Sequence, residues 1–329
     1  MKIVLMGESA EHREDLEGSL RGDHSVVAVP SAASSDAGFD TMLLDADVVI
    51  SRRLIRPVGS VAPAWGLLQV PGAGVDEIDM SALAPETTVC NVYEHEIPIA
   101  EFVMCAILEW EIGFHELRTS FDPSAWSGTY RARAPHGEVH GRRLGVVGYG
   151  RVGRAVATRA LAFGMDVVAV SRCVASDDRV KVLPQQSLPE LLRSSDYVVI
   201  ACPLTDETRG LVDAVALGQM RRSAVLVNVA RGPVVDERAL YLALQRESIA
   251  GAVLDVWYDY PVAGHETVEP SRYPIADLPN AWCTPHSSAW TRALSARRYT
   301  AIADNVERLA AGQQLANVVR PGVRPEPAR

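Results

Sequence analysis

The chain has 329 residues, 48% of them hydrophobic, which is enough for two globular domains of ordinary size. Its formal net charge is −9, and every run of Lys or Arg has acidic neighbours, which argues against a nucleic-acid-binding surface. No apolar run reaches transmembrane length, and the start of the chain lacks the pattern of a cleaved signal peptide. We therefore expect a cytoplasmic protein that acts on a small molecule.

Two residue types narrow this expectation. The five cysteines are odd in number and form no C-x-x-C pair, which is typical of reduced thiols in the cytosol. Only Lys2 and Lys181 are lysines among the 32 basic residues, so arginines must supply most contacts to any anionic ligand.

Before residue 95, short apolar runs alternate with polar helical stretches, which predicts a small parallel α/β domain. The predicted strands are 2–6, 25–29, 48–51, 66–70 and 89–91. A helix with a broad apolar face is predicted over 98–117, where we expect it to bridge two domains or to bury a subunit contact.

From Leu144 onward the alternation restarts with longer apolar runs, which are typical of strands covered on both faces. These strands are predicted at 165–170, 197–201, 224–229, 252–256 and 281–284, after the one that begins at Leu144. A helix rich in Arg and Ala is predicted over 291–311. Pro321, Pro325 and Pro327 then predict a tail that does not pack.

The apolar strand from Leu144 leads into a G-x-G-x-x-G turn followed by a helical pattern. Gly148 permits a tight turn, Gly150 lets backbone amides approach phosphates, and Gly153 lets the helix pack closely on the strand. The pattern predicts a dinucleotide whose pyrophosphate binds at the helix N-terminus.

Four blocks carry a family resemblance. They are the glycine turn, C-P-L-T-D-E-T-R-G-L from Cys202, N-V-A-R-G-P-V-V-D-E from Asn228, and T-P-H ending at His286. With these blocks the chain resembles the D-isomer-specific 2-hydroxyacid dehydrogenases almost from end to end. The resemblance implies two Rossmann-like parallel-sheet α/β domains. A dinucleotide-binding domain (96–290) is inserted in a discontinuous, flavodoxin-like substrate domain (1–95 and 291–329). It also implies a cleft between the domains as the active site, and a homodimer formed through the 98–117 region.

The resemblance also implies a set of cofactor-binding residues. They are Gly148, Tyr149, Gly150, Arg151, Val152, Gly153, Ser171, Arg172, Cys202, Pro203, Thr208, Val229, Ala230, Asp255 and Ser288. The family's NAD-preferring members usually end the second strand of this domain with Asp, whereas this strand ends with Ser171 and Arg172. A hydroxyl and a guanidinium bind a 2′-phosphate that a carboxylate would repel, which favours NADP(H) over NAD(H). The alternative is that Arg172 stacks on the adenine of NAD(H) while Asp177 or Asp178 binds the ribose.

Reduction of a 2-oxo acid requires a cation that polarises the carbonyl and an acid that protonates the new alkoxide. By their positions in the family blocks, these residues are Arg231 and His286. We expect Gly232 to let the substrate approach closely.

The family's third catalytic residue is a Glu that pairs with this His, and its position here is occupied by Tyr260. A phenol can orient an imidazole but cannot stabilise imidazolium as a carboxylate does, so we predict a lower pKa for His286 than in relatives with Glu. Three alternatives stay open. Another carboxylate substitutes (Asp259, Glu94, Glu96, Glu266 or Glu269), the enzyme acts chiefly as an oxidant, or the chain binds dinucleotide without fast turnover.

On the substrate side, the family holds the substrate carboxylate on backbone amides of a glycine loop, here those of Ala73 and Gly74. Arg52 stands where phosphoglycerate-type relatives place a substrate-contacting arginine, which hints at a second anionic group. Trp290 either closes over the substrate or packs at a hinge. We expect no metal site, because His265 with Glu266 and Glu269 lacks a second His or Cys at ligand spacing.

The sequence thus predicts an oxidoreductase that transfers a hydride between NAD(P)(H) and a small anionic 2-hydroxy or 2-oxo acid, acting on the CH–OH group. The alternatives are a dehydrogenase of the phosphite or formate type, and a dinucleotide-sensing binding protein.

Overall fold

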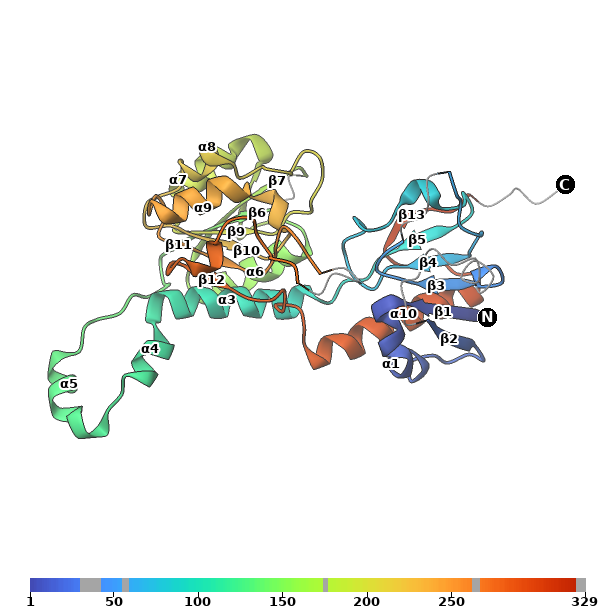
Figure 1. The fold of residues 1–329 in the computed structure, drawn as a ribbon, viewed down its shortest axis with the longest axis horizontal. Coiled ribbons are helices and arrows are strands. Elements are labelled where there is room, and N and C mark those ends of the chain that lie inside the picture. The colour runs from blue at the N-terminus through green and yellow to red at the C-terminus, as the bar shows by residue number, and fades with distance from the viewer. Residues whose placement is uncertain (30–42, 55–58, 174–176, 262–266, 324–329) are drawn as a thin grey trace. The chain divides into compact units, whose positions relative to one another are not determined.

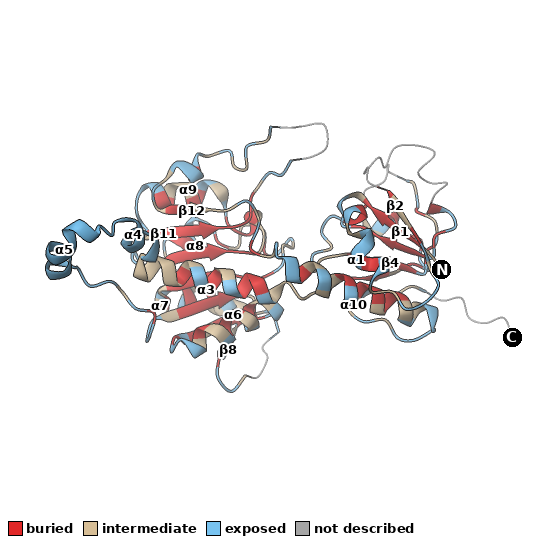
Figure 2. Cartoon of the chain, turned by 90° about the horizontal axis from the view of Figure 1, so that it is seen from below, coloured by how far each residue is buried: buried red, intermediate tan, exposed pale blue. Residues whose placement is uncertain are grey.

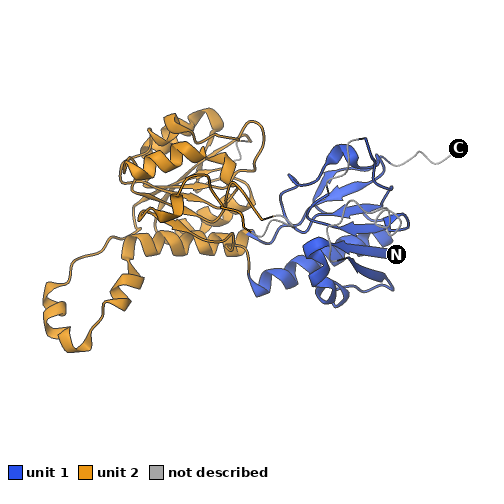
Figure 3. Ribbon diagram, in the orientation of Figure 1, with its two compact units in different colours: residues 1–95, 291–329 blue, residues 96–290 orange. Residues whose placement is uncertain are grey.

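The computed structural model describes residues 1–29, 43–54, 59–173, 177–261 and 267–323. The chain divides into two compact units (Figure 3). Unit 1 contains Met1–His95 and Thr291–Arg329, and unit 2 contains Glu96–Trp290. Each unit is built on its own β-sheet (Figure 1).

The sheet of unit 1 has the strand order β13-β5-β4-β3-β1-β2. Its strands are β1 (Lys2–Met6), β2 (Ser25–Val29), β3 (Val48–Ile50), β4 (Leu67–Gln69), β5 (Thr88–Cys90) and β13 (Val318–Arg320). The first five pair in parallel in the order 2-1-3-4-5, which is the doubly wound flavodoxin-like order. All five strands predicted for this part of the chain are present.

Successive side chains of these strands face opposite layers, which gives unit 1 two apolar cores. Val4 and Met6 lie in one core, whereas Ile3 and Leu5 lie in the other. The second core is covered by the helix α10 (Arg292–Ala310), which also contacts α1 (Arg13–Glu17).

The prediction of a tail that does not pack is wrong for residues 318–323. β13 pairs antiparallel with β5, and the amide of Val323 donates to the carbonyl of Pro85 (2.9 Å). Pro321 is tolerated because β13 is an edge strand, where a missing N–H leaves no ladder bond unmade. Pro325 and Pro327 lie outside the described residues.

The sheet of unit 2 has the all-parallel order β12-β11-β10-β9-β6-β7-β8. Its strands are β6 (Arg143–Val147), β7 (Asp166–Ser171), β8 (Lys181–Pro184), β9 (Tyr197–Ile200), β10 (Val225–Asn228), β11 (Gly251–Leu254) and β12 (Ala281–Cys283). Counted from β6, this is the Rossmann order 3-2-1-4-5-6 with a seventh strand at one edge. The short, half-exposed β8 is the one strand here that the sequence analysis missed.

Helices cover both faces of this sheet. The core on one face includes side chains of α3 (Glu96–Ile112) and α6 (Arg151–Ala162). The core on the other face includes side chains of α7 (Leu188–Ser194), α8 (Ala214–Leu217) and α9 (Glu237–Gln245). Short 3₁₀ helices complete the structure at Gly7–His12, Met80–Ala82, Pro123–Ala125, Gln185–Ser187, Gly232–Val234 and Ile275–Asp277. Among the described helices, none combines the length and apolar character needed to cross a membrane.

The helix predicted over 98–117 is interrupted. α3 ends at Ile112, and Gly113 adopts the left-handed conformation (φ 64°) that commonly terminates helices, before α4 (Phe114–Thr119) begins. α5 (Trp126–Ala132) follows, and every residue from 114 to 136 is exposed (Figure 2). We refer to residues 113–136 as the arm.

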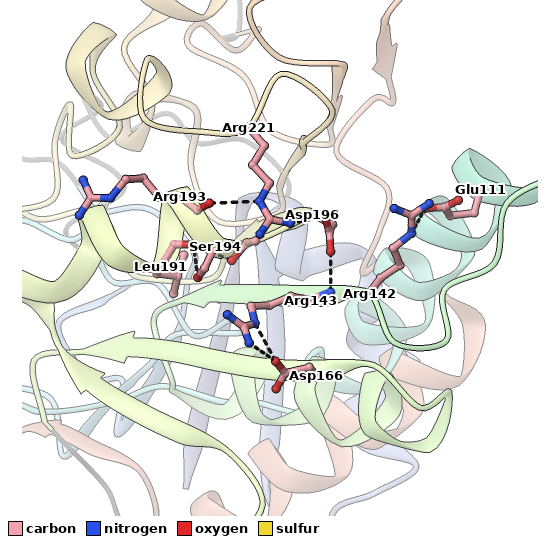
Figure 4. Close-up of polar contacts among 10 residues, drawn as sticks. Glu111, Arg142, Arg143, Asp166, Leu191, Arg193, Ser194, Asp196 and Arg221 are labelled. Atoms are coloured by element: carbon pink, nitrogen blue, oxygen red, sulfur yellow. Dashed lines mark hydrogen bonds and ion pairs between the residues drawn. The ribbon is translucent and has the colours of Figure 1, made fainter.

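The amino-terminal edge of the unit 2 sheet is held by charge pairs (Figure 4). Arg143 at the start of β6 donates through Nε to Asp166 at the start of β7 (2.6 Å), and its amide donates to Asp196 just before β9 (2.8 Å). Asp196 also accepts from Arg221 Nη1 (2.7 Å). These contacts join the strand starts directly to one another.

Candidate active site

Most of the predicted site residues follow strands of the unit 2 sheet. Because those strands are parallel, their carboxyl ends meet at one edge, where open α/β sheets bind ligands. The strand order then arranges the residues along that edge. Ser171 and Arg172 follow β7, the glycine turn follows β6, Cys202 follows β9, Arg231 follows β10, Asp255 and Tyr260 follow β11, and His286 follows β12.

The glycine turn fits a dinucleotide pyrophosphate. A Cβ on Gly148 (φ 100°) would collide with the backbone of Cys202, and one on Gly153 would overlap the carbonyl oxygen of Gly148. In contrast, a Cβ on Gly150 would meet nothing within 4 Å. Gly150 is also the N-cap of α6, where no side chain caps the helix. The first-turn amides of α6 have no partner inside the helix and carry its positive dipole end toward this open space.

Tyr149 connects the glycine turn to the loop after β7. Its buried hydroxyl donates to Asp177 Oδ2 (2.7 Å), and Asp177 Oδ1 accepts the amide of Arg179 (3.0 Å). Burial and this hydrogen bond raise the pKa of Tyr149 to about 12, while the same hydrogen bond lowers the pKa of Asp177. Both oxygens of Asp177 therefore hold the loop, whereas Arg172 and Asp178 are exposed.

The loop after β9 is fixed by Thr208. Its buried hydroxyl accepts the amide of Thr205 (2.7 Å) and donates to the carbonyl of Pro203 (2.6 Å). Cys202 is also buried, and burial raises the pKa of its thiol to about 11, so it is not a nucleophile at neutral pH. Thr208 thus shapes the segment that faces Gly148, while Pro203 is exposed.

Asn228 positions the loop that carries Arg231. This buried side chain accepts the amide of Ala230 (3.1 Å) and donates to the carbonyl of Arg231 (3.1 Å). Arg231 Nη1 in turn donates to the carbonyl of Ala230 (2.8 Å). The prediction that Gly232 makes room for the substrate is wrong, because a Cβ there would overlap the backbone of Trp257. Gly232 instead lets the loops after β10 and β11 pack together.

Asp255 holds the loop that carries His286. It is fully buried, and its two oxygens accept the hydroxyl of Thr284 (2.6 Å) and the amides of Ser287 (2.8 Å) and Ser288 (2.9 Å). His286 has a left-handed backbone (φ 56°), a conformation that costs free energy in a residue other than glycine. The hydrogen bonds to Asp255 on both sides of His286 maintain this conformation.

Tyr260 lies beside His286. The two ring centroids are 5.5 Å apart with an interplanar angle of 55°, and Tyr260 Oη accepts the amide of Trp257 (3.1 Å). Trp257 Nε1 donates to the carbonyl of Thr284 (2.9 Å), so Trp257 joins the Tyr260 segment to the His286 loop. The sequence analysis did not single out Asn228, Trp257 or Thr284. The signal that could have found them is their position at the strand ends, within the family blocks (Asn228 and Thr284) or two residues after Asp255 (Trp257).

The predicted substrate residues Arg52, Ala73 and Gly74 belong to unit 1. The carbonyls of Gly72 and Ala73 accept the amide of Val92 (3.1 Å) and Nδ2 of Asn91 (2.8 Å). Within the described part of the chain, no hydrogen bond uses the amides of residues 72–75.

Two further predicted residues are exposed. Arg52 pairs with the exposed Glu8 (3.4 Å). Trp290, at the end of unit 2, has 73% of its surface exposed. Among the described residues, no three His, Cys, Asp or Glu side chains are arranged to hold a metal; His265 and Glu266 lie outside those residues.

Comparison with known proteins assigns this arrangement to a family. The family model described as D-isomer specific 2-hydroxyacid dehydrogenase, NAD binding domain, matches residues 104–288. The chain belongs to this family.

Relatives agree with the assignment. A glyoxylate reductase of Thermococcus kodakarensis is 33% identical over 254 residues, which cover 74% of this chain and 73% of the relative. A D-3-phosphoglycerate dehydrogenase of Methanocaldococcus jannaschii is 31% identical over 284 residues, which cover 84% of this chain but only 52% of the relative. The chain therefore spans about half the length of that dehydrogenase.

A solved structure extends the likeness to the whole fold. The D-isomer specific 2-hydroxyacid dehydrogenase of Xanthobacter autotrophicus Py2, in complex with NADPH and MES, aligns with a TM-score of 0.76 at 26% identity. The alignment covers 96% of this chain and 97% of that one. The family assignment and the two-sheet α/β fold predicted from the sequence are thus both confirmed.

Proposed function

We propose that this protein transfers a hydride between NAD(P)(H) and C2 of a small 2-hydroxy or 2-oxo acid. One observation carries the proposal: Arg231, Tyr260 and His286 follow three neighbouring strands at the sheet edge that also holds the glycine turn. The bound nicotinamide would supply or accept the hydride at its C4 atom. Family membership supports the same reaction class.

Arg231 is the proposed anchor for the substrate. Its guanidinium would pair with the substrate carboxylate and polarise the 2-oxo group, where negative charge develops as the hydride arrives. Asn228 supports this role, because its two hydrogen bonds fix the backbone on either side of the Ala230–Arg231 peptide. A guanidinium on a fixed backbone loses little free energy to reorganisation during the reaction.

His286 is the proposed proton donor in reduction and the proton acceptor in oxidation. Its ring lies 5.5 Å from that of Tyr260, which would orient it as the family's Glu orients the histidine of relatives. Asp255 and Trp257 would act through the loop, by fixing the peptide that holds His286. In unit 1, the amides of Ala73 and Gly74 would donate hydrogen bonds to the substrate carboxylate, while the carbonyls of Gly72 and Ala73 are already bonded.

A panel of 2-oxo acids tests the reaction, with NADPH and NADH oxidation followed separately. We expect turnover with at least one 2-oxo acid, and a loss of about a thousandfold in kcat/KM for Arg231→Gln. Arg238→Gln, an exposed arginine on α9, is the matched control and should keep wild-type activity. Tight dinucleotide binding without turnover on any 2-oxo acid, or an active Arg231→Gln variant, would refute the proposal.

We also propose that the cofactor is NADP(H). Arg172 is exposed at the end of β7, next to Ser171, where it could pair with a 2′-phosphate. The alternative ribose ligand Asp177 has both oxygens engaged by Tyr149 and Arg179. Of the two carboxylates that could bind the ribose, Asp177 therefore serves the loop, which supports the phosphorylated cofactor, while the exposed Asp178 stays the alternative.

The variant Arg172→Asp tests this preference. It replaces a charge-assisted hydrogen bond with a repulsion, so kcat/KM for NADPH should fall about 100-fold while that for NADH changes little. Arg193→Asp, an exposed change on α7, serves as the control. The preference would be excluded if wild type favoured NADH or if both cofactors lost activity equally.

We propose that two copies of the chain form a dimer through α3 and the arm. A cavity of about 500 Å³ lies beside α3, lined by residues that include Met104, Cys105 and Leu108 of α3 and Phe114 of the arm. Four arm aromatics are at least half exposed, namely Phe114, Phe121, Trp126 and Tyr130. A second copy would cover this apolar surface.

Light scattering during size exclusion tests the dimer, since the mass should be twice 35.6 kDa. The double variant Phe121→Ser and Trp126→Ser should shift the mass toward one copy. A wild-type mass of one copy would refute the dimer.

We infer a reducing, cytoplasmic location from the cysteines. All five are free, and burial raises the thiol pKa of Cys90, Cys202 and Cys283. Thiol counting on protein alkylated inside intact cells should give five free thiols. A disulfide trapped in that experiment would contradict the inference.

A further inference from the structure

Arg298 occupies a position on α10 that normally belongs to the apolar core. It lies four residues after Leu294 and four before Ile302, both buried, so it shares their stripe toward the sheet. An arginine on such a stripe requires a polar neighbour or a ligand.

The direction of α10 places Arg298 past the carboxyl edge of the unit 1 sheet. Leu309 packs over Gly66, just before β4 begins, and Asn305 Nδ2 donates to Oε1 of Gln69, where β4 ends (2.9 Å). The helix therefore runs opposite to β4. Arg298 precedes Asn305 by seven residues, a displacement of about 10 Å along the helix axis, which brings it to the level of the 71–74 loop.

Arg298 has no anionic partner among the described residues. Its Nε is buried without a hydrogen-bond acceptor, and no carboxylate of the described chain forms an ion pair with it. The adjacent Arg297 differs, because it pairs with Glu94 (3.4 Å). Burial lowers the pKa of Arg298, which reflects the cost of keeping this charge away from water. A partly buried guanidinium whose Nε has no acceptor favours an oxyanion partner.

Arg52 supplies a second positive charge at the same place. The turn after β1 lies near both arginines: the charge of Glu8 acts on Tyr299, which follows Arg298, and Glu8 pairs with Arg52 (3.4 Å). The charge of Arg52 is close enough to contribute to the lowered pKa of Arg298, after burial. Glu8 is exposed and its pair with Arg52 is weak, so an incoming anion can displace it.

The arginine pair lies next to the amides proposed to hold the reacting carboxylate. β3 and β4 are neighbours, with Ile50 opposite Gln69, so Arg52 and the 71–74 loop leave adjacent strands. Adjacent strands are about 4.8 Å apart. Two anionic groups of one small molecule can span this separation.

We propose that Arg298 and Arg52 form a subsite for a second anionic group of the substrate, a carboxylate or a phosphate on the carbon chain beyond C2. The substrate class is then dianionic 2-oxo and 2-hydroxy acids. This inference rests on the hydride-transfer function proposed above for the location of the first carboxylate.

Kinetics with three probes test the subsite: glyoxylate with one anionic group, oxaloacetate with a second carboxylate, and 3-phosphonooxypyruvate with a phosphate. Wild type should prefer one of the two dianions to glyoxylate by about tenfold or more in kcat/KM. Arg298→Met should lower kcat/KM for that dianion about 10- to 100-fold, chiefly through KM, and leave glyoxylate within about threefold. Arg298→Lys should restore part of the loss, and Arg308→Met, an exposed change on the same helix, should have no effect.

The preferred dianion distinguishes carboxylate from phosphate. An equal loss on glyoxylate and on the dianion would assign Arg298 a structural role and overturn the proposal, as would an unchanged profile.

A binding experiment separates this proposal from the proposed function. Malonate and inorganic phosphate are titrated calorimetrically into wild type and Arg298→Met without cofactor. Binding of either anion that is lost in the variant supports the subsite even if no 2-oxo acid is turned over. Equal binding to both proteins refutes the subsite even if turnover is observed.

Discussion

Polar residues have different roles where the strands of the unit 2 sheet begin (the amino edge) and where they end (the carboxyl edge). At the amino edge, charged side chains pair directly across strand starts, as Arg143 does with Asp166 and Arg221 does with Asp196 (Figure 4). At the carboxyl edge, buried polar side chains such as Asn228 and Asp255 instead bond backbone groups of the loops. The amino edge therefore joins strands, whereas the carboxyl edge fixes the shapes of loops that present other residues.

This difference shows how one sheet combines stability with chemistry. The polar groups that fix the carboxyl-edge loops are buried, so Arg231 and His286 are held by residues that need not touch a ligand. Arg143, Asp166 and Arg221 are exposed in these pairs, while Asp196 is mostly buried. Ion pairs with exposed partners contribute little to the free energy of unfolding. The predictions below compare the two edges.

The largest effect is expected for Asp255→Ala. The change leaves two amides and the hydroxyl of Thr284 without their acceptor, which should cost about 2–4 kcal/mol of unfolding free energy. Loss of the loop's shape should also lower kcat about a thousandfold. Urea unfolding and steady-state kinetics measure both effects. Near wild-type kcat in folded protein would show that Asp255 does not position His286.

Alanine substitutions at Gly150 and Gly153 should affect different properties, cofactor affinity in the first case and stability in the second. Gly150→Ala places its Cβ in open space, so the free energy of unfolding should change by less than about 0.5 kcal/mol while cofactor affinity falls about tenfold. Gly153→Ala overlaps the Gly148 carbonyl and should destabilise the fold by about 1–3 kcal/mol. Thermal unfolding and cofactor fluorescence titration measure the two quantities. The assignment of Gly150 to the phosphate contact fails if its variant binds the cofactor normally.

Tyr260→Glu should shift the pH dependence of the reaction rate. A carboxylate beside His286 stabilises imidazolium, so the pKa that limits the reaction should rise by about one unit. The rate of 2-oxo acid reduction should then persist to higher pH, and the rate of oxidation should begin to rise at higher pH. Tyr260→Phe is the control that adds no charge. If the limb of the pH–rate profile assigned to His286 does not move in Tyr260→Glu, then residue 260 does not act on His286.

The smallest effect is expected at the amino edge. Asp166→Ala removes an exposed pair with Arg143 and should reduce the unfolding free energy by at most about 1 kcal/mol, with kcat unchanged. The same assays as for Asp255→Ala apply. A loss of activity here would contradict the division of roles between the two edges.

Patterns within single segments made much of this structure predictable. Uniformly apolar runs predicted the central strands. The spacing of Gly148, Gly150 and Gly153 predicted a turn, and its geometry fits the predicted roles of the three glycines. β8 and β13 were missed because edge strands are short and partly exposed, so they lack an apolar run. The break at Gly113 was missed because the apolar pattern continues past it into α4.

Side-chain roles that depend on two segments could not be predicted from one. Gly232 was assigned to the substrate, although its missing Cβ serves the packing of Trp257 from another loop. Asp255 was assigned to the cofactor by position, and only the fold reveals its three bonds to the His286 loop. Arg298 was not noticed, because its lack of a partner is a property of the packed unit.

The most direct test of the account is a single-turnover measurement with His286→Asn. Wild type and variant are each mixed with reduced cofactor and the best 2-oxo acid of the panel, and cofactor oxidation is followed by absorbance. The account predicts unchanged cofactor affinity and a hydride-transfer rate at least about a thousandfold lower in the variant. Hydride transfer at the wild-type rate in His286→Asn would contradict it.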